Sequence, residues 1–337
     1  MATGTTTYGD INQRTAAWAA TEMLSHAEPV IVLAKFGMSK PLPKNKADTV
    51  KFRRVIPFDA VTVPLLEGVA PSPRKMQYED VTCVMKQWGD VVEITDVVAD
   101  QSEDPVLRDA SQQCGEQAGK TLEAVTWGVL RAGTSVIYAN GSGRNAVNTV
   151  ITKRKQQAAT RLLKRQKAKK ITQILDGSPK FQTKGIEAAY IAVAHSDLET
   201  DIRNMAGFTP VADYGSRKPV CAEEIGCVDD VRYVLSPDLD FFPDLGGAYN
   251  GSGEDMVTTT GVSADVYPII IFGREAYGLV PLKGAGAIEP KVLNPGTPRG
   301  GDPLGQLGTV GWKSYFNAVI LNDSWMVRLE VACSDLG

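Results

Sequence analysis

The sequence has few of the residues that build metal centres or charge-relay triads. Only two histidines, His26 and His195, occur among the 337 residues. A metal site with several histidine ligands is therefore excluded, and a Ser-His-Asp triad would have to use one of these two. His195 stands in AHSD, where Ser196 and Asp197 adjoin it and Ser196 better suits the cap of a following short helix. We therefore predict no catalytic residue, no metal site and no cofactor.

Long apolar runs and paired cysteines are also missing. The longest apolar stretch, YPIIIFG, is far shorter than the ~20 residues that a membrane-spanning helix needs. MATGTTTYGD lacks the basic and apolar regions of a secretory signal. The five cysteines form no C-x-x-C, and for the C-x5-C of Cys221 and Cys227 free buried thiols outweigh a metal site. These features predict a soluble chain in a reducing compartment, with no membrane partner.

Neither sign of charge is in large excess. The formal net charge is −3 and the pI is about 5.6, which excludes a chain that binds polyanions over its whole surface. Residues 153–170 differ, because they hold nine basic residues and no acidic one. The nine are Lys153, Arg154, Lys155, Arg161, Lys164, Arg165, Lys167, Lys169 and Lys170. We expect them on a helix over residues 146–175, and three interpretations stay open: contact with nucleic-acid phosphates, contact with an acidic patch on a neighbouring copy, or a solvated helix face.

Glycine and proline, by contrast, are plentiful. The 32 glycines, 19 prolines and 43% hydrophobic residues predict an α+β chain of two or three packed modules. A polar tail is expected to hold one short helix that begins after Asp10 and ends at Pro29. A long helix, capped by Ser102 or Asp104 and ended by Gly133, is indicated by small and apolar residues at spacings of three and four. They are Val106, Ala110, Cys114, Ala118, Leu122, Val125 and Val129.

Strands account for most of the remaining chain. Short ones are predicted in TSVIYAN, AAYIAVAHS and EIGCVDDVRYVLSP. Longer ones are predicted in VVEITDVV, whose valines indicate a buried core, in DVYPIIIFGREAYGLVPL and in SYFNAVILNDSWMVRLEVAC. Glycine- and proline-rich loops are expected over residues 243–262 and 283–309.

TVKFRRVIPFDAVTVPLLEG, residues 49–68, is unusual for a strand. Val50, Phe52, Ile56 and Phe58 alternate on one face, whereas the other carries a row of cations. Prolines interrupt the run, and proline lacks the N–H that a central strand must donate. With a return limb over residues 75–96 and prolines at the tip, this predicts a long hairpin arm. An unpaired edge is useful if a second copy completes it, so we expect Lys51, Arg53, Arg54 and, on the return limb, Trp88 to contact a neighbouring subunit.

Two stretches resemble nucleotide-binding loops. GSGRNA, residues 141–146, matches G-x-G-x-x-A between a strand and a helix. Of the two ribose-side partners that such a site can use, an acidic residue ~20 positions on or an arginine, only the arginine, for the 2′-phosphate of NADP, is available. GSGRNA follows a long helix instead of opening a βαβ series, so a plain turn is favoured. CGEQAGKT, residues 114–121, is similar to a phosphate-binding loop but lies inside the predicted long helix, where its N–H groups cannot turn toward a phosphate. Neither stretch makes a convincing enzyme site.

The order of these parts resembles the major capsid protein of tailed bacteriophages, in the podophage coat family. The stretches that carry the resemblance span most of the chain. They are AEPVIVLAKFGMSKPLPKNKADTVKFRR, VPLLEGVAP, DVVEITDVVADQSEDPVL, GEQAGKTLEAVTWGVLRAGTSVIYAN and FGREAYGLV.

The resemblance implies the Johnson, or Hong Kong 97, fold. Its parts would be an N-terminal arm (1–47), an E-loop hairpin (48–97), a P domain with the long spine helix (98–178 and 264–337) and an A domain (179–263). The implied function is a non-enzymatic one, self-assembly of hexamers and pentamers into an icosahedral shell around double-stranded DNA. The implied partners are a separate scaffolding protein, a portal, a decoration protein and the packaged DNA, with assembly in the host cytoplasm and residence in the virion capsid. The alternatives are a nanocompartment shell protein and an NADP-dependent enzyme.

Overall fold

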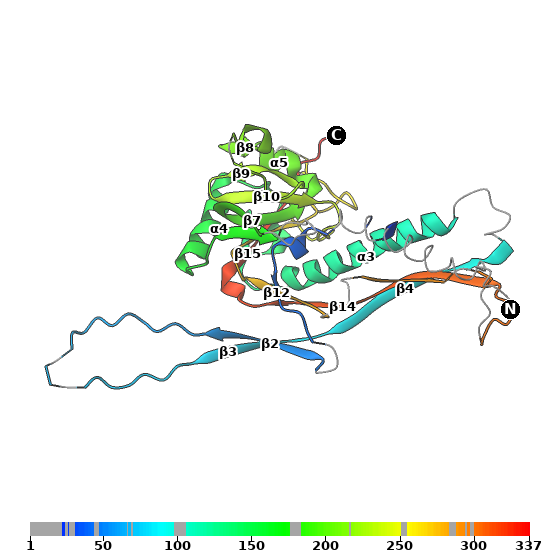
Figure 1. Ribbon diagram of the computed structural model, residues 1–337. Coiled ribbons are helices and arrows are strands. Elements are labelled where there is room, and N and C mark those ends of the chain that lie inside the picture. Colours follow the sequence, from blue (N-terminus) through cyan, green and yellow to red (C-terminus); the bar gives the residue numbers. More distant parts are fainter. Residues whose placement is uncertain are drawn as a thin grey trace.

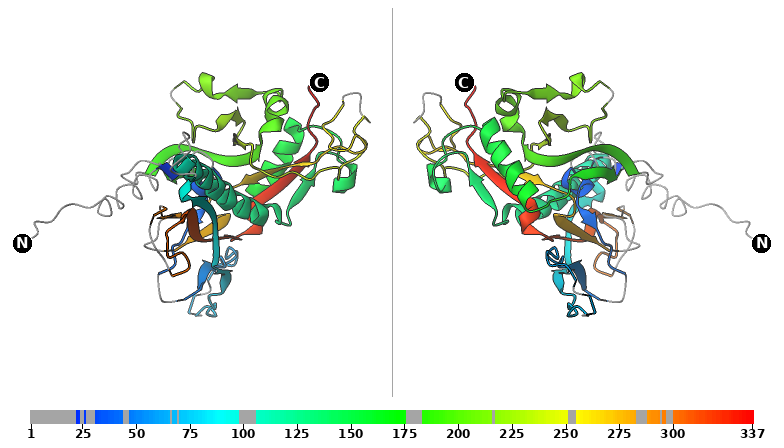
Figure 2. Two further views of the ribbon diagram at one scale, coloured as in Figure 1. Left: turned by 90° about the vertical axis from the view of Figure 1, so that its right-hand side faces the viewer. Right: turned by 90° about the vertical axis from the view of Figure 1, so that its left-hand side faces the viewer.

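The computed structural model describes residues 22–23, 26, 31–43, 47–65, 67–68, 70–97, 106–175, 183–215, 217–250, 255–282, 288–293, 295–296 and 300–337. Most of the helix predicted after Asp10 lies outside these residues, as do the predicted caps Ser102 and Asp104. Figures 1 and 2 show three parts. A body built on an eight-stranded sheet stands above the long helix α3, a five-stranded sheet lies beneath that helix, and a two-stranded hairpin projects below it.

The helix α3 (Val106–Arg131) runs along the five-stranded sheet as one continuous element of 26 residues. Cys114, Ala118, Leu122, Trp127 and Leu130 are buried in the main hydrophobic core. This spacing of three to five residues gives the helix one continuous buried face. The predicted long helix is confirmed, and CGEQAGKT lies inside it as a helical segment.

The five-stranded sheet has the order β1-β12-β14-β13, and β4 pairs with the other side of β14. Its strands are β1 (Met38–Ser39), β4 (Lys86–Thr95), β12 (Tyr277–Pro281), β13 (Glu289–Leu293) and β14 (Leu307–Ile320). β14 pairs with β4 through ten residue pairs and supports α3 on its buried face.

The eight-stranded sheet has the order β5-β15-β11-β7-β10-β9-β8, and β6 pairs with β7. Its strands are β5 (Val136–Tyr138), β6 (Ile171–Leu175), β7 (Thr183–His195), β8 (Phe208–Pro210), β9 (Glu224–Val228), β10 (Val231–Ser236), β11 (Tyr267–Phe272) and β15 (Met326–Val331). The helices α4 (Lys153–Arg165) and α5 (Glu199–Arg203) belong to the same body. β7 and β10 are parallel, whereas β11 is antiparallel to both of its neighbours. The central strands β10, β11 and β15 are buried along their whole length. One face packs into the main core through Val234, Ile270, Phe272 and Met326, and the other face forms a second core.

Short 3-10 turns connect these elements. They are η3 (Leu33–Lys35), η4 (Arg144–Ala146), η5 (Ser196–Leu198), η6 (Val211–Asp213) and η7 (Asp323–Trp325). The turn η5 is capped by His195, whose side chain accepts a hydrogen bond from the Asp197 N–H. The prediction that Ser196 is the cap was therefore wrong by one residue.

The hairpin consists of β2 (Thr49–Val55) and β3 (Tyr78–Val84), which are antiparallel. Val50, Phe52 and Cys83 at its base are buried against Leu42 and Val280. The predicted long hairpin is confirmed, but its return limb divides. β3 pairs with β2, and after Met85 the strand β4 leaves the hairpin to join β14.

Other predicted elements have different limits. The helix expected over residues 146–175 is limited to Lys153–Arg165. It starts only after the extended Thr152, and the positive φ of 55° at Lys167 prevents its continuation. EIGCVDDVRYVLSP forms the hairpin β9–β10 instead of one strand, and β13 lies within the predicted loop 283–309.

The described valines of VVEITDVV do not reach the core as predicted. Val91, Val92 and Val97 are exposed, and Ile94 is the one buried residue among the described residues 91–97, in line with the position of β4 at the edge of its sheet. Of the helices described, none is both apolar enough and long enough to span a bilayer.

Candidate functional site

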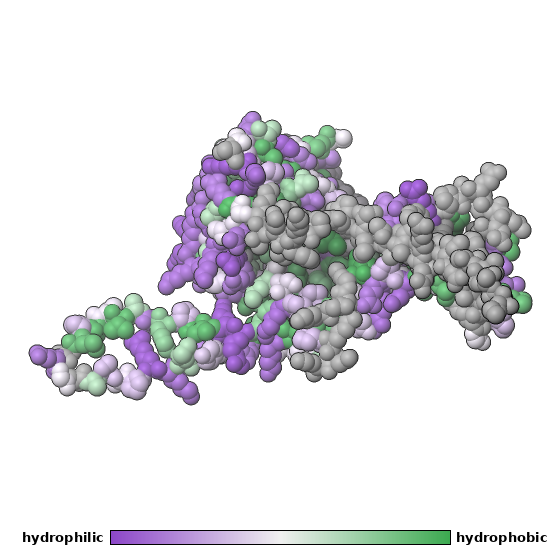
Figure 3. All heavy atoms as spheres, viewed as in Figure 1, coloured by the Kyte–Doolittle hydropathy of each residue, from purple (hydrophilic) through white to green (hydrophobic). Residues whose placement is uncertain are grey.

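The outer half of the hairpin, residues 55–78, is an apolar surface without cover in the single chain. We call it the outer arm. Its exposed apolar side chains are Val55, Ile56, Phe58, Val61, Val63, Leu65, Met76 and Tyr78, and Leu65 is 74% exposed. Figure 3 shows apolar stretches along the projecting hairpin, with hydrophilic residues between them. Because solitary chains rarely expose apolar side chains in such a continuous series, the outer arm is the first candidate interaction surface.

The cationic row of β2 is paired within the hairpin. The Arg53 guanidinium donates to both carboxylate oxygens of Asp80 at 2.8 and 2.9 Å, and Arg54 forms an ion pair with Glu79. The register places each arginine directly opposite its carboxylate. The hydrogen bond from Arg53 lowers the pKa of Asp80, and the nearby Lys51 ammonium acts in the same direction. Glu79 and Asp80 were missed in the sequence because the register was not known.

Trp88 and the base of β2 also make internal contacts. The Trp88 indole N–H donates to the Phe316 carbonyl at 3.0 Å, and its half-buried ring packs against the main core. Val50 and Phe52 are buried in the hairpin base, so only Ile56 and Phe58 of the predicted apolar face remain exposed. The contacts of Lys51, Arg53, Arg54 and Trp88 with a neighbouring subunit stay predictions.

The basic block divides between α4 and the turn that follows it. Lys153, Arg154, Lys155, Arg161, Lys164 and Arg165 lie on α4, whereas Lys167, Lys169 and Lys170 come after its end. The helix packs through Gln156, Ala159, Thr160 and Leu163, which fall on one face at helical spacing. Its opposite face forms part of the hydrophilic surface of the upper body in Figure 3.

Several of these cations have partners in the β9–β10 turn. Lys153 lies 3.4 Å from Asp229, while Lys164 and Lys170 lie 2.5 and 3.0 Å from Asp230. The hydrogen bond from Lys164 lowers the pKa of Asp230. The Lys155 ammonium donates to the Tyr138 carbonyl at 2.8 Å. Part of the basic block therefore stabilises the body itself.

The remaining cations form a charged surface. Arg154, Arg161, Arg165, Lys167 and Lys169 are exposed, and none of them has an ion-pair partner among the described residues. Arg161 and Arg165 line an open cavity of about 620 Å³ between α4 and the β9–β10 turn. This surface suits an anionic partner, and it is the second candidate interaction surface.

GSGRNA is a structural corner and not a nucleotide loop. Arg144 donates to both carboxylate oxygens of buried Glu330 at 2.7 and 2.8 Å and lies 3.5 Å over the Phe242 ring. The three-residue η4, and not a long helix, follows the glycines. Arg144 thus makes contacts inside the chain and no long helix starts at the glycines, so the structure gives no support to the NADP interpretation.

Comparison with known proteins decides between the remaining interpretations. The family described as phage capsid protein matches residues 78–329, about three quarters of the chain. The chain belongs to the phage capsid protein family. This family assignment favours a phage shell over the nanocompartment alternative, and it makes the protein a structural one that self-assembles into a virion capsid. No curated protein sequence matches this capsid protein.

Solved capsid structures share the fold of this capsid protein. The capsid of Ralstonia phage GP4 has a TM-score of 0.63 at 12% identity, covering 91% of this chain and 88% of that one. The capsid of cyanophage P-SCSP1u has a TM-score of 0.55 at 14% identity, covering 90% and 89%. The capsid of cyanophage Pam1 has a TM-score of 0.54 at 14% identity, covering 92% and 93%. The predicted Hong Kong 97-like α+β fold is confirmed.

Proposed function

We propose that this capsid protein forms hexamers and pentamers of an icosahedral shell that encloses the double-stranded DNA of a tailed phage. The observation that carries the proposal is the outer arm, because its apolar surface projects from the body and needs a second copy as cover. The described residues between β2 and β3 form no strand of their own. Apart from the Ile56 N–H, which donates to the Gln77 carbonyl, and the Asp59 carbonyl, which accepts from Arg74, their backbone groups could pair with a neighbouring subunit.

The proposal extends to partners and to domains. A separate scaffolding protein, a portal and a decoration protein would act with the shell during assembly in the host cytoplasm. The division into an arm, an E-loop, a P domain and an A domain at the boundaries given above stays a prediction. The predicted boundary between the P domain and the A domain passes through one sheet, since β5, β11 and β15 of the predicted P domain share it with β7 of the predicted A domain.

The outer arm gives the experiment that tests this function. Ile56→Ser with Phe58→Ser removes two exposed apolar side chains and leaves the buried Val50 and Phe52 unchanged. We expect near-wild-type circular dichroism and Tm, together with sedimentation as small oligomers and no shells in negative-stain images. Val262→Ser, which changes an exposed valine of the upper body, is the matched control and should still form shells.

Two outcomes would contradict the proposal. Normal shells from the double variant would show that the outer arm is not an assembly contact. Mature wild-type particles, free of scaffolding protein, that enclose another protein and no DNA would favour a nanocompartment instead. Charge reversal of Arg53 and Arg54 is a poorer test, because it places like charges opposite Asp80 and Glu79 within the hairpin.

A further inference from the structure

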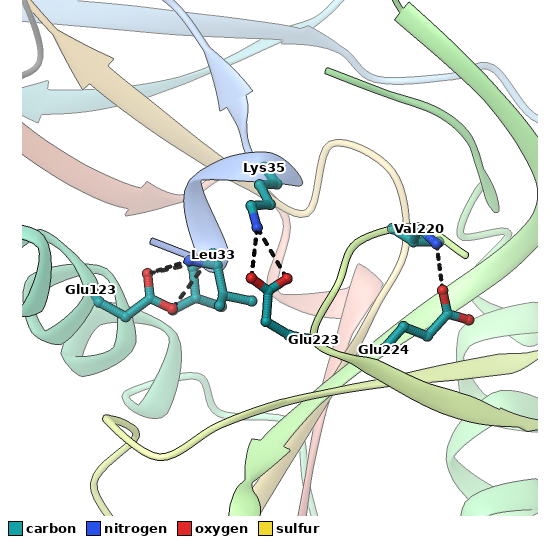
Figure 4. A network of polar contacts seen from close by, with 7 residues as sticks. Leu33, Lys35, Glu123, Val220, Glu223 and Glu224 are labelled. Atoms are coloured by element: carbon teal, nitrogen blue, oxygen red, sulfur yellow. Dashed lines mark hydrogen bonds and ion pairs between the residues drawn. The ribbon is translucent and has the colours of Figure 1, made fainter. Parts of the chain in front are cut away.

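The N-terminal arm is attached to the body through η3. Val32 and Leu33 are almost completely buried and belong to the main core. The Tyr277 hydroxyl on β12 donates to the Leu33 carbonyl at 2.6 Å. The Lys35 ammonium lies 3.0 Å from Glu223, in the loop before β9. Figure 4 shows η3 between α3 and this loop. One short segment therefore contacts both the long helix and the body built on the eight-stranded sheet.

The third attachment is a buried carboxylate on α3. Glu123 is 1% exposed, and its two oxygens accept hydrogen bonds from the Val32 and Leu33 N–H groups at 3.1 to 3.2 Å. No cation lies within ion-pair distance of Glu123 in the described part of the chain, because Lys35 is paired with Glu223. Burying a carboxylate without a cation is costly, and two backbone N–H groups offset only part of that cost.

We propose that residues 32–35 form a proton-controlled latch between the N-terminal arm and α3, which is tight while the Glu123 carboxyl is protonated and weaker once it ionises. Undocking of η3 would return the carboxylate to water. Docking and protonation of Glu123 are therefore linked, and a rise in pH favours the undocked arm.

The surrounding charges support this direction. Burial raises the pKa of Glu123 to about 7, and Asp238 also raises it, whereas the two N–H groups and Lys35 oppose the shift. Tyr277, on the β12 side, stays neutral because burial raises its pKa well above the usual range. Partial burial favours neutral Glu223, but a backbone N–H and the Lys35 ammonium lower its pKa overall. Glu223 thus stays ionised over the range in which Glu123 titrates.

Hydrogen exchange of the Val32 and Leu33 amides tests the latch, measured on the unassembled full chain and corrected for intrinsic exchange. Protection should fall about 30-fold between about pH 5.5 and pH 8.5. This is the change expected if the pKa of Glu123 is 4.5 in the undocked arm and about 7 in the docked arm. Glu123→Gln should remove this dependence. Asp109→Asn, an exposed carboxylate on the same helix, should keep it. Lys35→Ala should lower protection at every pH and make its fall with rising pH steeper, because Lys35 opposes the raised pKa of Glu123.

Two results would overturn the latch. One is protection in the wild-type protein that does not change with pH, which needs no variant. The other is a wild-type slope in Glu123→Gln, which would assign the titration to another group. Since the chain is unassembled, both results are independent of shell formation.

Discussion

At the scale of single residues, Gly115 shows how a sequence motif can have a packing cause. A glycine inside a helix costs roughly 1 kcal/mol relative to alanine. A Cβ at Gly115 would lie 2.3 Å from the Met23 carbonyl oxygen and 3.1 Å from the Met23 Cα. Glycine therefore lets the N-terminal segment approach α3 closely. This contact accounts for Gly115, the first of the two glycines in CGEQAGKT, without a phosphate.

Gly115→Ala should consequently destabilise the protein despite its better helix propensity. The new methyl group must push the Met23 backbone away, so we expect a loss of about 1–3 kcal/mol. Gly128→Ala is the matched control on the same helix, since no atom lies within 4 Å of its added Cβ. It should gain about 0.5–1 kcal/mol. Urea unfolding measures both, and equal effects from the two variants would refute the packing explanation.

A second prediction at this scale concerns Glu330. It is fully buried between Arg144 and Arg328, at 2.7 and 2.8 Å. Glu330→Gln leaves two guanidinium groups facing each other without their anion, and it should cost about 3 kcal/mol. Thermal unfolding would show this loss. A change of less than about 0.5 kcal/mol would mean that solvent already screens the cluster.

At the scale of elements, α4 combines packing and charge. Its buried face fixes the helix on the upper body, while Asp229 and Asp230 hold Lys153 and Lys164 in place. Arg161 and Arg165 remain free to meet an anionic partner in the described structure. The sequence left open contact with phosphates and contact with a neighbouring subunit. These two interpretations predict different effects when the exposed arginines of α4 are replaced by uncharged residues.

Arg161→Gln with Arg165→Gln separates these two interpretations. If α4 contacts packaged DNA, empty shells should form normally and retain several-fold less genome, because two phosphate contacts are lost. The comparison uses Arg203→Gln with Arg217→Gln, two arginines of the same body that pair with Glu199 and Glu187. Failure to form empty shells would instead assign this face to a neighbouring subunit.

At the scale of the whole molecule, α3 and η3 lie between the five-stranded sheet and the body built on the eight-stranded sheet. Glu123 lies where α3 meets η3. Its pKa is raised on folding, so the folded chain binds a proton that the unfolded chain releases between pH 4.5 and about 7. Stability from this group is therefore highest at low pH and falls as pH rises. The carboxylates with lowered pKa values, such as Asp80 and Asp230, change the pH dependence of stability only at lower pH, where they become protonated.

Global stability should accordingly fall by about 2 kcal/mol between about pH 5.5 and pH 8.5. Glu123→Gln should flatten this change, and the exposed-site variant Asp109→Asn should preserve it. Urea unfolding at fixed ionic strength measures the difference. Parallel pH profiles for the wild-type protein and Glu123→Gln would contradict the assigned pKa.

The sequence by itself determined the features that depend on local pattern. Period and caps marked α3, alternation and prolines marked the hairpin, and the order of parts indicated the capsid fold. The tertiary structure decided which distant residues meet. Only the register of β2 and β3 places Glu79 and Asp80 opposite the arginines, and only chain packing brings Arg144 to Glu330, 186 residues away. The burial of Glu123 likewise depends on η3, because a helical pattern shows which residues share a face and not what covers them.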